Sequence, residues 1–264
     1  MKRRGPPKAA RKPTARPERD EPKLLRVAGL PAVEALFATA PGRVERLFFL
    51  ESLKNRVGPL CMTIAKSHKT YRVVREDELR RIAGTSMHGG IVALAAPPAM
   101  ARFDPAAAEA WAKAGEPLLI LDGVGNPHNL GAIARTAAFF GIRRMVLSDH
   151  ADQASPSDAA YRVARGGLEA IAVHRVERLP EMLRRIKTSY RVVGTALTRG
   201  EPLDSLARDD RPIALVLGNE EEGLSSATLA ATPEIVRLAG TGGVQSLNVA
   251  ATAAILIHAL LRRA

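Results

Sequence analysis

Residues 118–137 have the sequence LLILDGVGNPHNLGAIARTA, and this stretch decides the fold. A short apolar run over 118–124 leads into a loop rich in Gly and Asn, and an amphipathic helical pattern follows. Further apolar runs of strand length are separated by helical stretches and occur at 145–148, 192–197, 213–218 and 235–238. Continuous apolar strands that alternate with helices are typical of a parallel sheet buried on both faces. We therefore expect an α/β domain over 117–264.

The chain upstream of this stretch alternates between helical and strand patterns on a smaller scale. Helices are predicted over 31–38, 52–67 and 76–83, and strands over 44–50, 71–75 and 90–95. We expect a small α/β domain over 23–96. Pro97 and Pro98 end it, and Asp104-Pro105 predicts the start of a helix that carries Trp111, so 97–116 is expected to be a linker with a short helix.

Residues 1–22 contain five prolines, eight basic residues and three acidic residues. They hold too little apolar surface to offset the entropy of ordering, which predicts a disordered basic tail. Such a tail would bind RNA without sequence preference through its charge. A solubilising leader is the alternative.

The whole chain is basic, with 39 Lys and Arg against 27 Asp and Glu and a formal net charge of +12. This charge favours a polyanionic partner such as RNA. The single Cys61 excludes an internal disulfide and a thiolate cluster for zinc, and no His, Cys or Glu spacing predicts a metal site. No apolar run approaches the length of a membrane span, so the cytosol is the expected compartment.

Polar residues gather in three loops that should follow strands, where ligands of parallel sheets bind. In the first, Asn129 is a plausible N-cap, and Leu130, Ile133, Ala134 and Ala137 form one apolar helix face. Arg135 lies about 140° round the helix from Leu130 and should point away from the core. A solvated helix arginine is the alternative reading. The spacings G-x-G-x-x-G and G-x-x-x-x-G-K-[ST] are both missing, which disfavours NAD and ATP.

The second loop, 218–225, has the sequence GNEEEGLS and could bind a cation, hold ribose hydroxyls or cap the next helix. The third loop, 242–250, has the sequence GGVQSLNVA, and Ser246 is a natural N-cap for the apolar helix that runs to Leu261. A helix that is apolar all round must be covered on every side, either as the last core helix or as a dimer contact.

Taken together, the three loops resemble the signature motifs of the SpoU/TrmH family of RNA ribose 2′-O-methyltransferases, within the SPOUT superfamily. Asn129, Gly131 and Arg135 match N-x-G-x-x-x-R; residues 218–224 match G-[NA]-E-x-x-G-[LM]; and residues 246–249 match S-L-N-V. The sequence departs from the family at Ala239-Gly240, where many members have Pro-Met, and at Ala250, where they have Ser. The resemblance covers about 117–263 and, more loosely, 24–96.

The resemblance implies a C-terminal trefoil knot, S-adenosylmethionine as the cofactor, no metal, a substrate that is ribosomal or transfer RNA, and a homodimer with the active site at the subunit interface. It implies a cofactor site made of Thr195, Leu217, Gly218, Asn219, Glu220, Gly223, Leu238, Ser246 and Leu247. It implies Arg135 as the catalytic residue, with Asn129, Glu220, Ser246 and Asn248 orienting it and the ribose. Because a guanidinium keeps its proton to above about pH 12, we expect Arg135 to bind the adjoining phosphate and stabilise the developing alkoxide rather than act as a base.

Two other functions are compatible with parts of the sequence. One is an RNA-binding ribosome-assembly factor with the same fold and no catalysis; retention of Arg135, Glu220, Ser246 and Asn248 argues against it. The other is a small-molecule oxidoreductase on a Rossmann-like sheet, which lacks the glycine fingerprint. Basic residues of the leading domain would either hold RNA phosphates or form solvated helix faces, namely Lys54, Arg56, Lys66, Lys69, Arg72, Arg80 and Arg81.

Overall fold

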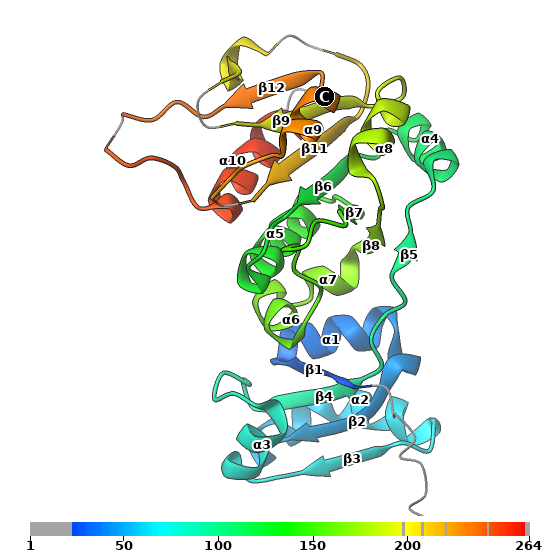
Figure 1. Cartoon of the computed structure of the whole chain (residues 1–264). Helices are drawn as coiled ribbons and strands as arrows, with labels where there is room; N and C mark the ends of the chain where they lie inside the picture. The colour runs from blue at the N-terminus through cyan, green and yellow to red at the C-terminus, as the bar shows by residue number, and fades with distance from the viewer. Residues whose placement is uncertain (1–22, 197–198, 207–208, 220, 242, 262–264) are drawn as a thin grey trace, which may run out of the picture.

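The computed structural model describes residues 23–196, 199–206, 209–219, 221–241 and 243–261. Within these ranges the chain forms a four-stranded sheet followed by an eight-stranded sheet, stacked end to end in an elongated molecule (Figure 1). The predicted tail, 1–22, lies outside the described residues.

The small sheet has the strand order β1-β4-β2-β3. Its strands are β1 (Leu25–Ala28), β2 (Val44–Phe49), β3 (Thr70–Val73) and β4 (Ile91–Ala95), and its helices are α1 (Leu30–Thr39), α2 (Lys54–Lys66) and α3 (Glu76–Ala83). Strand β4 runs antiparallel to β1 and β2, whereas β2 and β3 are parallel. The three predicted helices and three predicted strands are confirmed to within a few residues at their ends. Strand β1 was not predicted, because its four residues carry no clear alternation.

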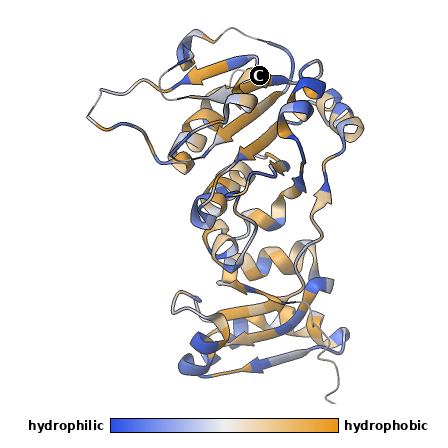
Figure 2. Ribbon diagram, viewed as in Figure 1, coloured by the Kyte–Doolittle hydropathy of each residue, from blue (hydrophilic) through white to orange (hydrophobic). Residues whose placement is uncertain are grey.

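The large sheet has the strand order β10-β12-β9-β11-β6-β7-β8-β5, and its pairings are parallel. The strands are β5 (Ala101–Arg102), β6 (Leu118–Asp122), β7 (Arg144–Leu147), β8 (Ala172–Arg175), β9 (Arg191–Thr195), β10 (Glu201–Pro202), β11 (Ile213–Gly218) and β12 (Glu234–Arg237). The expected parallel α/β sheet is therefore confirmed. The central strands β6 and β11 are strongly apolar in Figure 2, as strands covered on both faces should be.

Helices cover both faces of the large sheet. One face packs against α5 (Pro127–Phe139), α6 (Asp158–Ala164), α7 (Gly167–Ala170) and α10 (Val249–Leu261). The other packs against α4 (Pro105–Lys113), α8 (Leu179–Ile186) and α9 (Ser226–Ala231). The region 97–116, expected as a linker, thus contributes β5 and α4 to the large sheet. As predicted, Asp104 caps α4, accepting a hydrogen bond from the backbone N of Ala106 at 2.9 Å.

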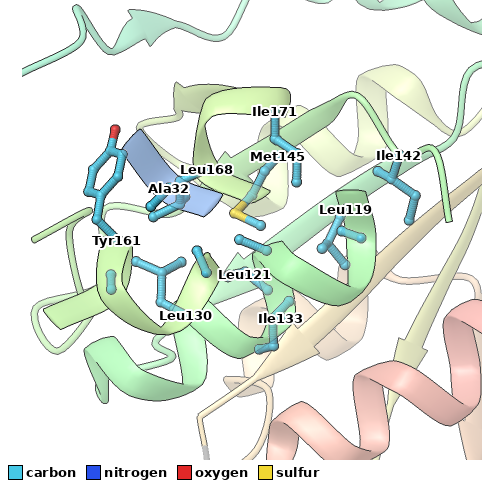
Figure 3. Close-up of a cluster of buried hydrophobic side chains, with 14 of the residues drawn as sticks. Ala32, Leu119, Leu121, Leu130, Ile133, Ile142, Met145, Tyr161, Leu168 and Ile171 are labelled. Atoms are coloured by element: carbon cyan, nitrogen blue, oxygen red, sulfur yellow. The ribbon is translucent and has the colours of Figure 1, made fainter. Parts of the chain in front are cut away.

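Buried contacts join the part of the chain that carries the small sheet to α6 and α7. Ala32 of α1 belongs to the same apolar cluster as Leu168 and Tyr161 (Figure 3). At the edge of this cluster the Arg43 Nη1 lies 2.7 Å from the Glu169 Oε2, and both side chains are largely buried. The junction is therefore a packed interface, with an ion pair enclosed in it.

Candidate active site

The first two polar loops leave the large sheet side by side. Strands β6 and β11 are parallel neighbours, with Asp122 opposite Gly218, so both chains enter their loops at the same edge. The Asn219 Nδ2 donates a hydrogen bond to the carbonyl oxygen of Gly123 at 2.9 Å. This hydrogen bond links the second loop to the first at the carboxyl ends of the central strands. A ligand site was expected at these strand ends from the sequence.

The second loop is a tight turn closed by its own backbone. Asn219 and Gly223 exchange backbone hydrogen bonds of 2.9 and 3.0 Å, and the Asn219 Oδ1 accepts from the backbone N of Glu221 and Glu222. A Cβ at Gly218 would lie 2.3 Å from the carbonyl carbon of Gly223, so only glycine fits there. Gly223 has φ +73° and open space above it. Glu220, predicted for both catalysis and cofactor binding, lies outside the described residues.

Side chains from outside the loops hold their base, and no sequence motif predicted these contacts. The Gln153 Oε1 accepts hydrogen bonds from the backbone N of Gly123 and Val124, at 3.0 and 3.1 Å. Thr228 of α9 donates from Oγ1 to the buried Asp122 Oδ2 at 2.7 Å. The shape of the first loop thus depends on residues far away in the chain.

The structure corrects both predicted N-caps. Asn126 caps α5, because its Oδ1 accepts from the backbone N of His128 at 2.8 Å and Pro127 occupies the first helical position. Asn129 therefore lies inside the first turn. Helix α10 begins at Val249, and the Asn248 Oδ1 accepts from the backbone N of Ala250 at 2.8 Å. Ser246 precedes the helix and is not its cap.

One side-chain hydrogen bond joins the first and third loops. The Asn248 Nδ2 donates to the Asn129 Oδ1 at 3.0 Å, which brings together two predicted catalytic residues 119 positions apart. Ser246 and Leu247 lie on an exposed stretch that leads away from the sheet after β12 and returns at α10 (Figure 1). Within the described residues, no hydrogen bond or ion pair links this stretch to the turn at 218–223.

The other three predicted cofactor residues lie along the same carboxyl edge of the sheet. Leu217 is buried beneath the turn, Thr195 is half-buried at the end of β9, and Leu238 is half-buried just after β12. A cavity of about 620 Å³ lies nearby, lined by residues including Gly200, Ser226 and Ile235. None of the predicted cofactor residues that the structure describes lines this cavity.

Arg135 is exposed on the third turn of α5 and points away from the core, as predicted, while Leu130, Ile133, Ala134 and Ala137 face the core. Its backbone is held by α7: a Cβ at Gly167 would lie 2.8 Å from the Arg135 Cα. Across the described part of the chain, its guanidinium makes no hydrogen bond or ion pair. The structure therefore fixes the position of Arg135 and leaves its charge available to a ligand.

The basic residues of the small sheet are mostly paired with acids on the surface. Lys54 pairs with Glu51, Arg56 with Glu34, Lys69 with Glu45, Arg72 with Glu78 and Arg81 with Asp77. Such exposed pairs are weak and exchange readily. Lys66 and Arg80 have no such partner among the described residues.

Among the described residues, no three or more His, Cys, Asp or Glu side chains are grouped as metal ligands would be. None of the described helices is both long and apolar enough to cross a membrane.

Comparison with known proteins finds two family models along the chain. The SpoU rRNA methylase family matches residues 116–258, and the model for RNA 2′-O ribose methyltransferase substrate binding matches residues 26–101. A relative from Escherichia coli O157:H7, named uncharacterized tRNA/rRNA methyltransferase YfiF, is 33% identical over 236 residues. That match covers 88% of this chain and 66% of the relative, so the chain spans just under two thirds of that protein's length.

Two further proteins match over most of their own length. The 23S rRNA (guanosine-2′-O-)-methyltransferase RlmB of Nitrosomonas europaea is 30% identical over 242 residues, which is 90% of this chain and 91% of the relative. The crystal structure of an AdoMet-bound rRNA methyltransferase from Sinorhizobium meliloti superposes with a TM-score of 0.72 at 21% identity, covering 91% of this chain and 87% of that one. At 21% identity, the match to the Sinorhizobium meliloti structure shows the fold alone.

Proposed function

Because the chain belongs to the SpoU rRNA methylase family, we propose that it transfers a methyl group from S-adenosylmethionine to a ribose 2′-hydroxyl of ribosomal or transfer RNA. The observation that carries the proposal is the hydrogen bond between Asn129 and Asn248, which joins the first and third motifs beside the tied first and second loops. The Rossmann-like oxidoreductase alternative has no support from the family match.

The residues present fit S-adenosylmethionine. The turn at 218–223 offers backbone groups, and among the described residues nothing beyond the chain neighbours lies within 4 Å of an added Cβ at Gly223, so that a flat adenine ring can approach the backbone there. Leu217, Asn219, Thr195 and Leu238 would complete the site on the sheet, with Glu220, Ser246 and Leu247 contributed by the loops. When bound, the cofactor supplies a methyl group already activated by its sulfonium.

In the proposed reaction, the protein chiefly aligns the 2′-hydroxyl with that methyl and assists the loss of its proton. Arg135 binds the adjoining phosphate and stabilises the alkoxide that develops on the ribose oxygen. Asn129 and Asn248 orient Arg135 and the ribose, together with Glu220 and Ser246. The proton leaves to phosphate or water, since the guanidinium stays charged.

The proposal includes a division of the chain into a small RNA-binding domain over 23–96, a linker over 97–116 and a knotted methyltransferase domain over 117–264, with a basic tail over 1–22. Family membership supports the trefoil knot and the substrate-binding role of the small domain. Reaction on ribosomal or transfer RNA places the protein in the cytoplasm. A catalytically inactive RNA-binding factor of the same fold is the outcome that the experiment below distinguishes.

We further propose a homodimer formed through α5 and α10. Phe139 is 82% exposed and Ile255 is 43% exposed, and the Phe140 ring packs on His258 at 5.7 Å, which joins the two helices at this surface. Exposed apolar side chains grouped in this way are typical of interfaces. Phe139→Ser with Ile255→Ser should give a monomer by light scattering; an unchanged mass, or a monomeric natural chain, would contradict the dimer.

Labelled methyl transfer tests the proposed function. The natural protein should move label from S-adenosylmethionine to in vitro transcribed 23S ribosomal RNA or to unmodified transfer RNA, and nuclease digestion should recover it as a 2′-O-methyl nucleoside. Arg135→Ala should lower the rate by about 100-fold or more, because it removes the charge that stabilises the alkoxide. Its affinity for S-adenosylhomocysteine should be unchanged.

The matched control is Arg184→Ala, an exposed arginine on α8 at the other face of the sheet. It should transfer methyl at the natural rate. Near-normal turnover by Arg135→Ala would remove Arg135 from the mechanism. Binding of RNA without any methyl transfer by the natural protein would favour the inactive RNA-binding factor.

A further inference from the structure

Helix α6 lies between β1 of the small sheet and α5, which carries Arg135 (Figure 1). Arg162 follows Asp158 by four residues and shares a face of this short helix with it, and Arg165 comes directly after the last helical residue. Asp158 accepts a hydrogen bond from the backbone N of Arg26 at 2.9 Å, and its other oxygen lies 3.8 Å from the Arg26 Nη1. Arg26, Arg162 and Arg165 therefore all belong to, or directly follow, the elements that meet on this side of the junction.

Arg165 has an unusual backbone for its residue type. It ends α6 with φ 49° and ψ 42°, the left-handed conformation, and its N–H donates to the carbonyl oxygen of Tyr161. Glycine is the usual residue here, and another side chain costs roughly 1–2 kcal/mol. The chain holds an exposed arginine in that conformation, immediately before two glycines. A costly conformation kept at an exposed charge is a reason to look for a ligand.

A short path leads from Arg165 to Arg135. Gly167 follows Arg165 by two residues and packs on α5, where its Cβ would be 2.8 Å from the Arg135 Cα. With consecutive Cα atoms 3.8 Å apart, the Cα atoms of the two arginines lie within about 12 Å of each other. Both side chains are exposed. Two long side chains this close can contact neighbouring phosphates of one strand.

These cations also differ from those of the small sheet in their surroundings. Among the described residues, Arg135, Arg162 and Arg165 have no acid within ion-pair distance, whereas Lys54, Lys69 and Arg72 each have one. A cation without an internal partner is available to an external anion. The guanidinium group suits phosphate in particular, because it can donate two parallel hydrogen bonds.

We propose that Arg165, with Arg162 and Arg26, forms a phosphate track that leads the RNA backbone across the junction to Arg135. The inference rests on the proposed function and specifies where the substrate runs. Arg165 acts here as a positioning residue, because it holds a phosphate next to the target nucleotide rather than the reacting atoms. Asp158 is half-buried and lies 3.8 Å from the Arg26 Nη1, and an ion pair of that length between partly exposed side chains weakens the contribution of Arg26 only slightly.

The test is filter binding of in vitro transcribed 23S ribosomal RNA between about 50 and about 200 mM salt. Arg165→Gln should bind about tenfold more weakly, because it loses a charged hydrogen bond to phosphate. The slope of log affinity against log salt should become shallower by about 0.7–0.9, the value for one phosphate contact. Arg162→Gln should change both quantities in the same direction. Arg165→Lys should restore the slope, because it restores the charge.

Methyl transfer gives the second readout. Arg165→Gln should raise the KM for RNA with kcat unchanged, since it removes binding that substrate and transition state share. The matched control, Arg184→Gln on α8, should leave the slope and KM unchanged. If Arg165→Gln behaves like that control, the track is wrong. RNA binding by the natural protein without methyl transfer would contradict the proposed function alone, and failure to bind RNA at low salt would contradict both.

Discussion

Gly131 shows why one motif residue has to be glycine. It lies where α5 crosses α6, and a Cβ there would be 2.4 Å from the carbonyl oxygen of Ala160 and 2.9 Å from the Val163 Cβ. Backbone cannot move aside as a flexible side chain can. The position therefore sets how closely α6 approaches the helix that carries Arg135.

Gly131→Ala should lower the free energy of unfolding by about 1–3 kcal/mol in urea denaturation, because it overpacks this crossing. Gly42→Ala is the matched control: Gly42 lies in the short 3₁₀ helix Pro41–Arg43, with nothing beyond its chain neighbours within 4 Å of an added Cβ. That substitution should raise stability by up to about 1 kcal/mol, since alanine restricts the unfolded chain more than glycine does. Equal effects at the two glycines would contradict the packing argument.

At the residue scale, the two predictions that the structure corrects are the helix caps. Pro127 indicates that Asn126 is the cap of α5, since proline favours the first helical position, yet the motif drew attention to Asn129. The cap of α10 is Asn248 rather than the predicted Ser246. Both residue types are good helix caps, and the two lie only two positions apart, so the pattern did not distinguish them. No local sequence pattern predicts the contacts of Gln153, since they depend on how distant parts of the chain fold together.

At the element scale, the junction between the small sheet and α7 contains an enclosed ion pair. The Glu169 side chain is 3% exposed and that of Arg43 is 18% exposed. Burial raises the pKa of the Glu169 carboxyl, and Arg43 opposes that rise. Burial, and then the charge of Glu169, raise the pKa of the neighbouring Tyr161 to about 12. The negative charge of Glu169 is therefore stabilised by the positive charge of Arg43 beside it.

Arg43→Met should lower the free energy of unfolding by about 3 kcal/mol near neutral pH, because it leaves Glu169 buried without its cation. The loss should shrink as the pH falls to about 4. Without Arg43, the folded-state pKa of Glu169 would rise further above its unfolded value of about 4.3. The stability that the protonated carboxyl contributes is fully present below the unfolded pKa and is lost as the pH rises through the folded-state pKa. Urea unfolding at the two pH values measures the difference.

Arg56→Met is the control for this prediction, because Arg56 forms an exposed pair with Glu34. It should cost less than about 1 kcal/mol, with little change between the two pH values. A loss in Arg43→Met that is the same at both pH values would mean that Glu169 does not titrate as described.

Strands could be predicted from the sequence only where they are apolar and long enough. Strands β6, β7, β9, β11 and β12 match the expected runs to within a few residues at their ends, because parallel strands covered on both faces are apolar. Strand β8 was missed, since its residues are exposed or half-buried and include His174 and Arg175. Strands β5 and β10 have two residues each, too few for any pattern.

At the scale of the whole molecule, the first two loops could be placed together from the sequence, because neighbouring parallel strands end at the same edge. The position of the third loop could not be predicted from the sequence. Val244 and Leu247 are exposed, and no hydrogen bond or ion pair among the described residues holds the stretch before Asn248 against the turn at 218–223. In the proposed account a cofactor or a second subunit holds this stretch, and neither can be recognised in the local sequence pattern.

The most direct measurement of the central claim is a crystal structure of the protein with S-adenosylhomocysteine. We expect the ligand against the turn at 218–223, in contact with Leu238, Ser246 and Leu247, and with Arg135 of one subunit facing the position of the missing methyl. A ligand bound only in the cavity beside α9, or away from the three loops in both subunits, would contradict the assignment of these loops to one active site.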